Sequence, residues 1–335
     1  MTDSATPSDK TPSTPRDAAT PPKPGGKKKT GERETFAGGR NLRGTQLSRT
    51  PDYLVIGHIT ADLQADGSVV LGGTALYSAL TAARLGAKVG ILTRGVFGTE
   101  VAGMKVPSLE PFADQVSIIV QDADVPTTFI NEYRADLRVQ TVPHWAGEID
   151  LRGLPPHWRN APIVHLGPVL QEINPNHAVG MTTEFIGITP QGWMRDWPRA
   201  TGGKVRHIPL RLPGSLLGRT DCAIVSTEEI HQARDVVERI GEQRLAVITR
   251  GKDGARIIAR GQTIDLPGFK VKTKDLTGAG DVFSAAFFMK ASDRSISAAA
   301  AGRFANAVAA LSLREVGVEA VPSMEQVDAL LAASV

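Results

Sequence analysis

Cysteine is almost absent from this sequence: Cys222 is the single cysteine among 335 residues, so no disulfide can form within the chain. Long apolar runs are also absent, and none approaches the ~20 residues that a membrane-spanning helix needs. The opening stretch MTDSATPSDKTPSTP lacks the apolar core of a secretory signal. The seven histidines are scattered, without HExxH or CxxC spacing, which argues against a zinc site. These absences predict a cytoplasmic protein with no membrane partner.

Charge is distributed unevenly along the chain. Residues 1–50 contain ten Lys and Arg against five Asp and Glu, whereas the remaining residues contain 28 against 30. The first segment is also rich in Pro, Ser, Thr and Gly and has no hydrophobic period, which is typical of disorder. We therefore expect a disordered basic tail over residues 1–50. The domain expected over residues 51–335 is slightly acidic, so nucleic acid is not an expected partner.

Short apolar segments alternate with amphipathic segments from Tyr53 onward. Strands are predicted at 53–57, 87–93, 115–120, 162–167, 184–189, 222–226, 245–251 and 255–260. Helices are predicted at 72–86, 192–197 and 227–241, and from Gly278 onward. Repeated pairs of an apolar strand and a helix predict an α/β fold, with a mainly parallel sheet flanked by helices.

Two segments interrupt this alternation. Residues 63–73 contain a DG turn between alternating residues, and residues 127–142 alternate around a central ADL. Both patterns predict small antiparallel strands outside the main sheet. These strands could form a lid over a site, or they could decorate an edge of the sheet. An exposed strand of the lid could also pair with a second subunit in a homodimer.

Two common phosphate-binding motifs, the nucleotide loop GxxxxGK[ST] and the dinucleotide fingerprint GxGxxG, are missing. Another glycine-rich stretch is nevertheless a candidate phosphate site. The sequence TGAGD, at residues 277–281, opens an apolar helix, and its glycines let a ligand approach the backbone closely. The free N–H groups of Gly278, Ala279 and Gly280 would attract a phosphoryl group. Asp281 is then either a base aimed at that group or an ordinary carboxylate at a helix start.

DLTGAGDVFSAAFF, at residues 275–288, resembles the second signature of the ribokinase/PfkB-like carbohydrate kinase family, in which DTxGAGD precedes a buried helix. Further pieces resemble the family in its order: GHITAD (57–62), GGTALYSALTAARLGAKVGILTRG (72–95), STEEI (226–230), ITRGKDGA (248–255) and ANAVAALS (305–312). The likeness extends over residues 53–333. It implies a ribokinase-like sandwich with a β lid, and phosphorylation of an alcohol with ATP and Mg²⁺. GITPQGWMRDW (187–197) weakly resembles inositol-kinase-like members, which favours a sugar or cyclic polyol as substrate.

The resemblance also implies roles for individual residues. Asp281 would take the proton of the alcohol, and the backbone of residues 278–280 would stabilise the transferred phosphoryl group. Glu229 would bind Mg²⁺ through water, although acidic residues are also common in the first turn of a helix. The remaining candidates would contact the substrate (Asp62, Gly72, Gly73 and Tyr77) or the nucleotide (Thr249, Gly251, Gly254, Thr277 and Asn306).

Three residues depart from the family pattern. Ser226 replaces the asparagine of the NxxE motif, Leu276 replaces a small polar residue in DTxGAGD, and Tyr77 replaces an asparagine that contacts sugar hydroxyls. Tyr77 could instead stack on a base, so a nucleoside kinase is one alternative. Ser226 and Leu276 leave a catalytically silent nucleotide-binding regulatory protein as another, whereas the intact GAGD favours an enzyme. Asn306 either faces the adenine or is an ordinary polar position of its helix.

Overall fold

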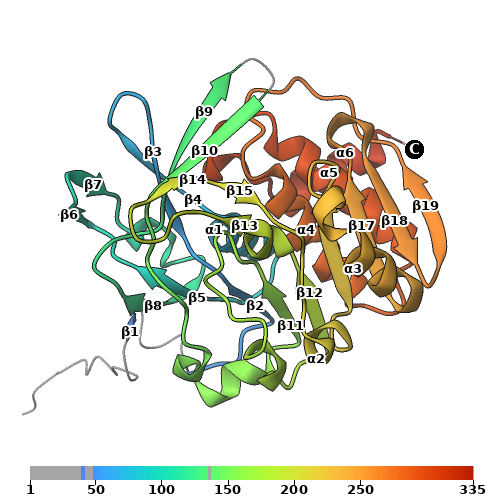
Figure 1. The fold of residues 1–335 in the computed structure, drawn as a ribbon. Coiled ribbons are helices and arrows are strands. Elements are labelled where there is room, and N and C mark those ends of the chain that lie inside the picture. Colours follow the sequence, from blue (N-terminus) through green and yellow to red (C-terminus); the bar gives the residue numbers. More distant parts are fainter. Residues whose placement is uncertain (1–38, 42–47, 135–136, 335) are drawn as a thin grey trace, which may run out of the picture. The chain divides into compact units, whose positions relative to one another are not determined.

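A computed structural model of the chain describes residues 39–41, 48–134 and 137–334. Ten strands form one large sheet in the order β1-β8-β5-β2-β11-β12-β16-β17-β18-β19 (Figure 1). The strands from β8 to β17 in this order run parallel, whereas β1, β18 and β19 are antiparallel to their neighbours. The predicted α/β fold with a mainly parallel sheet is therefore confirmed. The strand bounds are β1 Gly39–Asn41, β2 Tyr53–Ile56, β5 Val89–Gly95, β8 Ser117–Asp122, β11 Ile163–Leu166, β12 Phe185–Ile188, β16 Cys222–Ser226, β17 Leu245–Thr249, β18 Ala255–Ala259 and β19 Gln262–Leu266.

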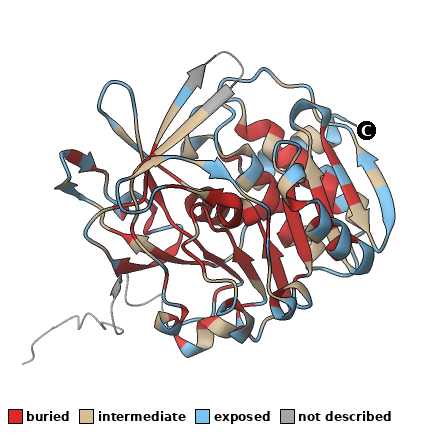
Figure 2. Ribbon diagram, viewed as in Figure 1, coloured by how far each residue is buried: buried red, intermediate tan, exposed pale blue. Residues whose placement is uncertain are grey.

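Strand β2 illustrates why the central strands are unbroken apolar runs. Tyr53 and Val55 belong to the hydrophobic core on one face of the sheet, and Leu54 and Ile56 belong to the core on the other face. Successive side chains of a strand point to opposite faces, and both faces are covered. A polar residue in β2 would therefore need a buried partner, and Figure 2 shows the central strands buried along their length.

Helices pack on both faces of the large sheet. The first core is shared by α1 Thr74–Arg84, α4 Ala279–Ala291 and α5 Ala298–Ser312, and the second by α3 Ile230–Gln243. Helix α4 is apolar on nearly all sides because it packs against α1 and α5 as well as against the sheet. No helix in the described ranges combines the length and the apolar character needed to cross a bilayer. The shorter helices are α2 Gly214–Leu217 and α6 Met324–Ala332, with 3₁₀ turns η1 Glu110–Phe112, η2 Leu151–Gly153, η3 Pro156–Asn160, η4 Ala178–Gly180, η6 Gly251–Asp253 and η7 Val318–Ala320.

A second sheet contains both segments that interrupt the alternation, in the order β14-β10-β9-β3-β4. Its first hairpin begins at Thr60, three residues earlier than predicted, and β14 was not predicted. Figure 1 shows β9 and β10 extending away from the large sheet. The roles of this sheet as a lid and as a dimer contact stay predictions. The bounds are β3 Thr60–Leu63, β4 Val69–Gly72, β9 Thr128–Arg134, β10 Leu137–His144 and β14 Gly203–Lys204, and two further pairs are β6 Thr99–Val101 with β7 Met104–Val106, and β13 Arg195–Asp196 with β15 Arg206–His207.

The disordered tail expected over residues 1–50 stays a prediction, but one short strand falls within these residues. Strand β1 lies within residues 1–50 and pairs with the edge of β8, where Gly39 stands opposite Gln121. Pairing of this kind uses backbone hydrogen bonds, so a hydrophobic pattern does not reveal it. Residues 48–50 of the predicted tail are exposed and in neither helix nor strand, and residues 1–38 and 42–47 lie outside the described residues.

The helix predicted over residues 192–197 is wrong. A 3₁₀ turn, η5 Pro190–Met194, is followed there by strand β13. Gly192 donates its N–H to the carbonyl of Pro168 at 2.8 Å, and a Cβ atom at this position would lie 2.5 Å from the same backbone. This close contact holds the turn against the loop after β11. Strand β13 follows directly after the turn.

Candidate functional site

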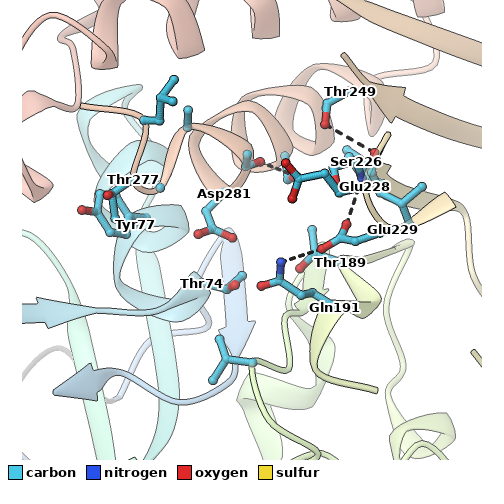
Figure 3. Close-up of a pocket in the computed structure, with 18 of the residues that line it drawn as sticks. Thr74, Tyr77, Thr189, Gln191, Ser226, Glu228, Glu229, Thr249, Thr277 and Asp281 are labelled. Carbon is cyan, nitrogen blue, oxygen red and sulfur yellow. Dashed lines mark hydrogen bonds between the residues drawn. The ribbon is translucent and has the colours of Figure 1, made fainter. Parts of the chain in front are cut away.

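A cavity of about 490 Å³ lies at the carboxyl ends of β12, β16 and β17, beside the amino-terminal end of α4. Ligands of open parallel sheets bind outside the carboxyl ends of the strands, which makes this the expected place for a site. Figure 3 shows Asp281 in the middle of the cavity, with Tyr77 and Thr277 on one side and Gln191 and Glu229 on the other.

The turn before α4 has a backbone that only glycine adopts easily. Gly278 has φ of 76° and precedes the first residue of α4, where the N–H groups are not used within the helix. A Cβ atom at Gly278 would lie 2.4 Å from the ring of Tyr77, so the ring packs directly against this peptide. The Asp275 carboxylate accepts the N–H of Thr277 at 2.9 Å and thereby fixes the entry to the turn. Residues 278–280, whose N–H groups are predicted to bind a phosphoryl group, therefore line the cavity on a defined turn, in which the N–H of Ala279 also donates to the carbonyl of Leu276 at 3.4 Å.

Asp281, the predicted base, lies in the first turn of α4 and lines the cavity. Its main-chain carbonyl accepts the hydroxyl of Ser78 at 3.3 Å, which connects α4 to α1. Burial, and then the charge of Asp281, raise the pKa of the Tyr53 phenol beneath the cavity. Burial and nearby carboxylates also raise the pKa of the Tyr77 phenol, which remains protonated; these carboxylates are Asp275, Asp281 and Asp62.

Glu229 is held from two sides at the start of α3. One carboxylate oxygen accepts the N–H of Ser226 at 2.9 Å, and the other accepts the side-chain amide of Gln191 at 2.5 Å. Glu228 lines the same end of the cavity. Carboxylate oxygens are ligands that Mg²⁺ prefers, usually together with water and phosphate oxygens. Glu229 therefore fits a role in binding Mg²⁺, although the described residues contain no group of three or more potential ligands.

The predicted substrate residues gather at the other end, where β3 and β4 meet α1. Asp62, Gly73 and Tyr77 line the cavity. Gly72 does not line it; a Cβ atom there would lie 3.1 Å from an oxygen of Asp62, so Gly72 leaves room for this carboxylate. Gly73 has φ of 90° and packs against the carbonyl of His58. Both glycines thus shape the backbone around Asp62.

Three of the predicted nucleotide residues line the cavity and two do not. Thr249, Gly251 and Thr277 are in its wall. Gly254 packs in the β17–β18 turn, where a Cβ atom would lie 2.2 Å from the carbonyl of Leu266. The buried Asn306 donates its side-chain amide to the carbonyl of Pro267 at 3.1 Å. Gly254 and the polar group of Asn306 are therefore used in holding the β18–β19 hairpin and the loop that follows it.

Most of the wall formed after β12 and by the second sheet was not predicted from the sequence. Thr189, Gln191 and Arg195 follow β12, and Arg195 is buried with its guanidinium over the ring of Phe129. The polar residues directly after the apolar strand FIGI could have indicated Thr189 and Gln191, because strand ends carry site residues in this fold class. Further residues of the lining are Thr60, Thr74, Gln140, Val169 and Ser284.

Comparisons with known proteins are consistent with this geometry. Residues 216–325 match the family described as "pfkB family carbohydrate kinase". The chain is 42% identical over 86 residues to the ribokinase of Bacillus subtilis, covering 25% of this chain but only 29% of that enzyme. It is 26% identical over 254 residues to the cytidine kinase of Thermococcus kodakarensis, covering 70% of this chain and 87% of that enzyme.

Among solved structures, the fold resembles a pyrophosphate-dependent kinase in the ribokinase family, complexed with a pyrophosphate analogue and myo-inositol. The TM-score is 0.64 at 19% identity, and the alignment covers 80% of this chain and 98% of the other. An identity this low shows a shared fold alone. The predicted ribokinase-like sandwich is therefore confirmed as the architecture that carries the cavity.

Proposed function

Because the chain belongs to the ribokinase/PfkB-like carbohydrate kinase family, we propose that it transfers the terminal phosphoryl group of ATP to a hydroxyl of a sugar or cyclic polyol. One observation carries the proposal: the N–H groups at the start of α4 and the carboxylate of Asp281 line the same cavity. An anion site next to a base is what in-line phosphoryl transfer to an alcohol requires.

Asp281 accepts the proton of the hydroxyl as its oxygen attacks the terminal phosphorus. A new P–O bond forms to the alcohol, the bond to the bridging oxygen breaks, and ADP leaves with that oxygen. The N–H groups of residues 278–280 hold the phosphoryl oxygens while negative charge builds on them. Mg²⁺, held through Glu229, would offset the charge of the β- and γ-phosphates. Asp62 accepts hydrogen bonds from other hydroxyls of the substrate and orients it.

A nucleoside kinase is the second candidate, because the cytidine kinase is similar over most of its length. The suggestion that Tyr77 stacks on a base does not support a nucleoside kinase. Tyr77 is 3% exposed and one face of its ring packs against Gly278, which leaves little of the ring available to a base. The choice between sugar, polyol and nucleoside therefore depends on the substrates that the enzyme turns over.

Release of ADP from Mg-ATP, in the presence of D-ribose, myo-inositol or cytidine, tests the proposal. We expect one acceptor to stimulate release, and Asp281→Asn to lower kcat by about 10²–10⁴-fold, the usual contribution of a general base. Asp293→Asn, which changes an exposed aspartate after α4 away from the cavity, is the matched control. Wild-type turnover that survives in Asp281→Asn would remove Asp281 from the chemistry. ATP that raises the melting temperature without any turnover would favour the silent nucleotide-binding protein.

A further inference from the structure

Three buried polar side chains form a hydrogen-bonded chain across the middle of the large sheet and end at the cavity wall. The hydroxyl of Tyr53 on β2 lies 2.9 Å from Nδ1 of His165 on β11, and Nε2 of His165 lies 2.8 Å from the hydroxyl of Thr189. Tyr53 and His165 are fully buried, whereas Thr189 is 8% exposed and lines the cavity. The proposed chemistry uses none of the three.

The His165 ring is neutral under ordinary conditions, because burial lowers its pKa to about 3. A neutral imidazole has one nitrogen that donates and one that accepts. The hydrogen bonds between Tyr53, His165 and Thr189 can therefore run in one of two directions. Either Tyr53 donates to Nδ1 and Nε2–H donates to Thr189, or the direction of both bonds is reversed.

The surroundings of Tyr53 decide between them. Among the described residues, the hydroxyl of Tyr53 makes one hydrogen bond, to His165, and no second hydrogen bond to it is found. In the reversed arrangement the phenolic hydrogen would be buried without an acceptor, and such an orphaned donor is avoided in proteins. Tyr53 therefore donates, Nδ1 accepts, and Nε2–H donates to the oxygen of Thr189.

The direction of these hydrogen bonds determines whether the Thr189 hydroxyl can donate a hydrogen bond to a ligand. Its oxygen already accepts from His165, so its own hydrogen is left to donate into the cavity. We infer that Thr189 is a specificity-determining residue, held as a hydrogen-bond donor to an oxygen of the alcohol substrate. The identity of the ligand rests on the proposed function. The direction of the hydrogen bonds from Tyr53 through His165 to Thr189 does not depend on it.

Thr189 lines the same cavity as Asp281 and Asp62, the two carboxylates proposed to bind the alcohol. Figure 3 shows Thr189 beside Gln191 and Glu229, with Asp281 on the opposite side at the start of α4. Asp281 and Asp62 offer acceptors to the hydroxyl hydrogens of the substrate, whereas Thr189 offers a donor. An oxygen that both donates and accepts, as in a polyol or sugar, satisfies such a site. A methylene at the same place would leave the Thr189 donor without a partner, which costs binding.

The direction of the hydrogen bonds through His165 can be measured without any substrate. In the ¹⁵N-labelled full-length protein, a long-range ¹H–¹⁵N spectrum identifies the protonated ring nitrogen of each histidine, and comparison with His165→Gln assigns the signals. We expect His165 to carry its proton on Nε2 throughout pH 5–8. A proton on Nδ1 overturns the inference, because Thr189 would then donate to the ring and not to the cavity.

Kinetics test the role of Thr189 with the acceptor, among D-ribose, myo-inositol and cytidine, that supports turnover. Thr189→Val keeps the shape and removes the hydroxyl, and we expect it to raise KM for the acceptor about five- to tenfold, as for loss of one hydrogen bond. Thr189→Ser should stay within about twofold of wild type, and KM for ATP should not change in either variant. Equal KM values for the acceptor in wild type and Thr189→Val overturn the inference.

The two tests separate this inference from the proposed function. If none of the three acceptors is phosphorylated, the proposed function fails, while the position of the His165 proton still shows whether Thr189 donates into the cavity. If turnover is found and Thr189→Val raises KM for ATP in place of KM for the acceptor, the proposed function stands and the assignment of Thr189 to the alcohol fails.

Discussion

The cavity wall at the start of α4 is contiguous in sequence, whereas the facing wall after β12 is assembled from residues far apart in the chain. Residues 277–281 form the first wall as one turn. In the second, Gln191 bonds Glu229 across 38 residues and Thr189 bonds His165 across 24. The first wall depends on backbone conformation at single positions. The second depends on several tertiary hydrogen bonds, each of which contributes about 1 kcal/mol.

This difference predicts how the two walls respond to substitution. A change in the contiguous turn should have an abrupt effect, because one residue fixes the direction of several N–H groups. A change in the assembled wall should have a graded effect, because its neighbours keep most of the geometry. Variants in each wall can break this comparison or sharpen it.

Gly278→Ala should have the largest effect on the folded protein. The new Cβ atom would meet the Tyr77 ring at 2.4 Å on a residue with φ of 76°. Strain and steric conflict together should lower the free energy of unfolding by about 2–4 kcal/mol, measured by urea denaturation. Turnover of ATP should fall with it, because the turn cannot keep its direction.

Gly280→Ala, in the same helix, is the matched control, since a Cβ atom at Gly280 would meet no atom within 4 Å apart from the neighbouring backbone of α4 itself. It should leave the unfolding curve unchanged or raise the stability by up to about 1 kcal/mol, as for Gly to Ala in a helix. Equal losses of stability in both alanine variants would show that the turn is not defined by Gly278.

In the assembled wall, the pH dependence of stability should reveal the buried His165. Its pKa falls from an unfolded value near 6.5 to about 3 in the folded protein. The unfolded chain therefore binds the extra proton as pH falls below about 6.5, and stability present above that pH is lost on acidification. We expect the free energy of unfolding to decrease by about 2 kcal/mol between pH 7 and pH 5 from this group alone.

Urea denaturation at both pH values measures this loss, and His165→Gln should reduce it. Part of the loss of stability on acidification should remain in His165→Gln, because burial also lowers the pKa of His58. A wild-type protein equally stable at pH 7 and pH 5 would contradict the burial of a neutral His165. If His165→Gln does not fold, the wild-type His165 signal should still show no titration down to pH 5.

The same contrast explains how far the sequence predicted the site. The role proposed for TGAGD could be inferred locally, because the glycines, the start of a helix and the following aspartate are all visible in consecutive residues. The apolar strands were equally visible, since β2 and its neighbours are covered on both faces. Both features follow from requirements that act within a few residues, so the fold class and the α4 wall could be predicted.

The other wall could not be predicted in this way. Gln191 became a site residue only because β12 and β16 are neighbours and bring it to Glu229. Tyr77 lines the cavity as well, but its packing against Gly278 was not visible in the sequence. Asn306 seemed an adenine contact, yet its amide binds the carbonyl of Pro267. In each case the partner lies far away in sequence, and no local pattern specifies it.

Gln191→Leu should have a moderate effect on turnover. It removes the amide that holds one oxygen of Glu229 at 2.5 Å but leaves the N–H of Ser226 on the other oxygen. We expect kcat/KM for Mg-ATP to fall about tenfold, as for one hydrogen bond to a charged group. Gln243→Leu, at the far end of α3 and outside the cavity, is the control. A loss as large as that of Asp281→Asn would show that this wall is as intolerant as the turn.

Ser226→Asn should have the smallest effect, although it restores the asparagine typical of the family. Gln191 already presents an amide to Glu229, so a second amide should change kcat/KM for Mg-ATP by less than about threefold. In the Gln191→Leu background the same substitution should recover part of the lost activity, because the new amide then meets a carboxylate oxygen without its partner. Steady-state kinetics of the two single variants and the double variant measure this coupling. Strictly additive effects would mean that Gln191 and residue 226 do not serve the same carboxylate, and the assembled wall would then consist of independent residues.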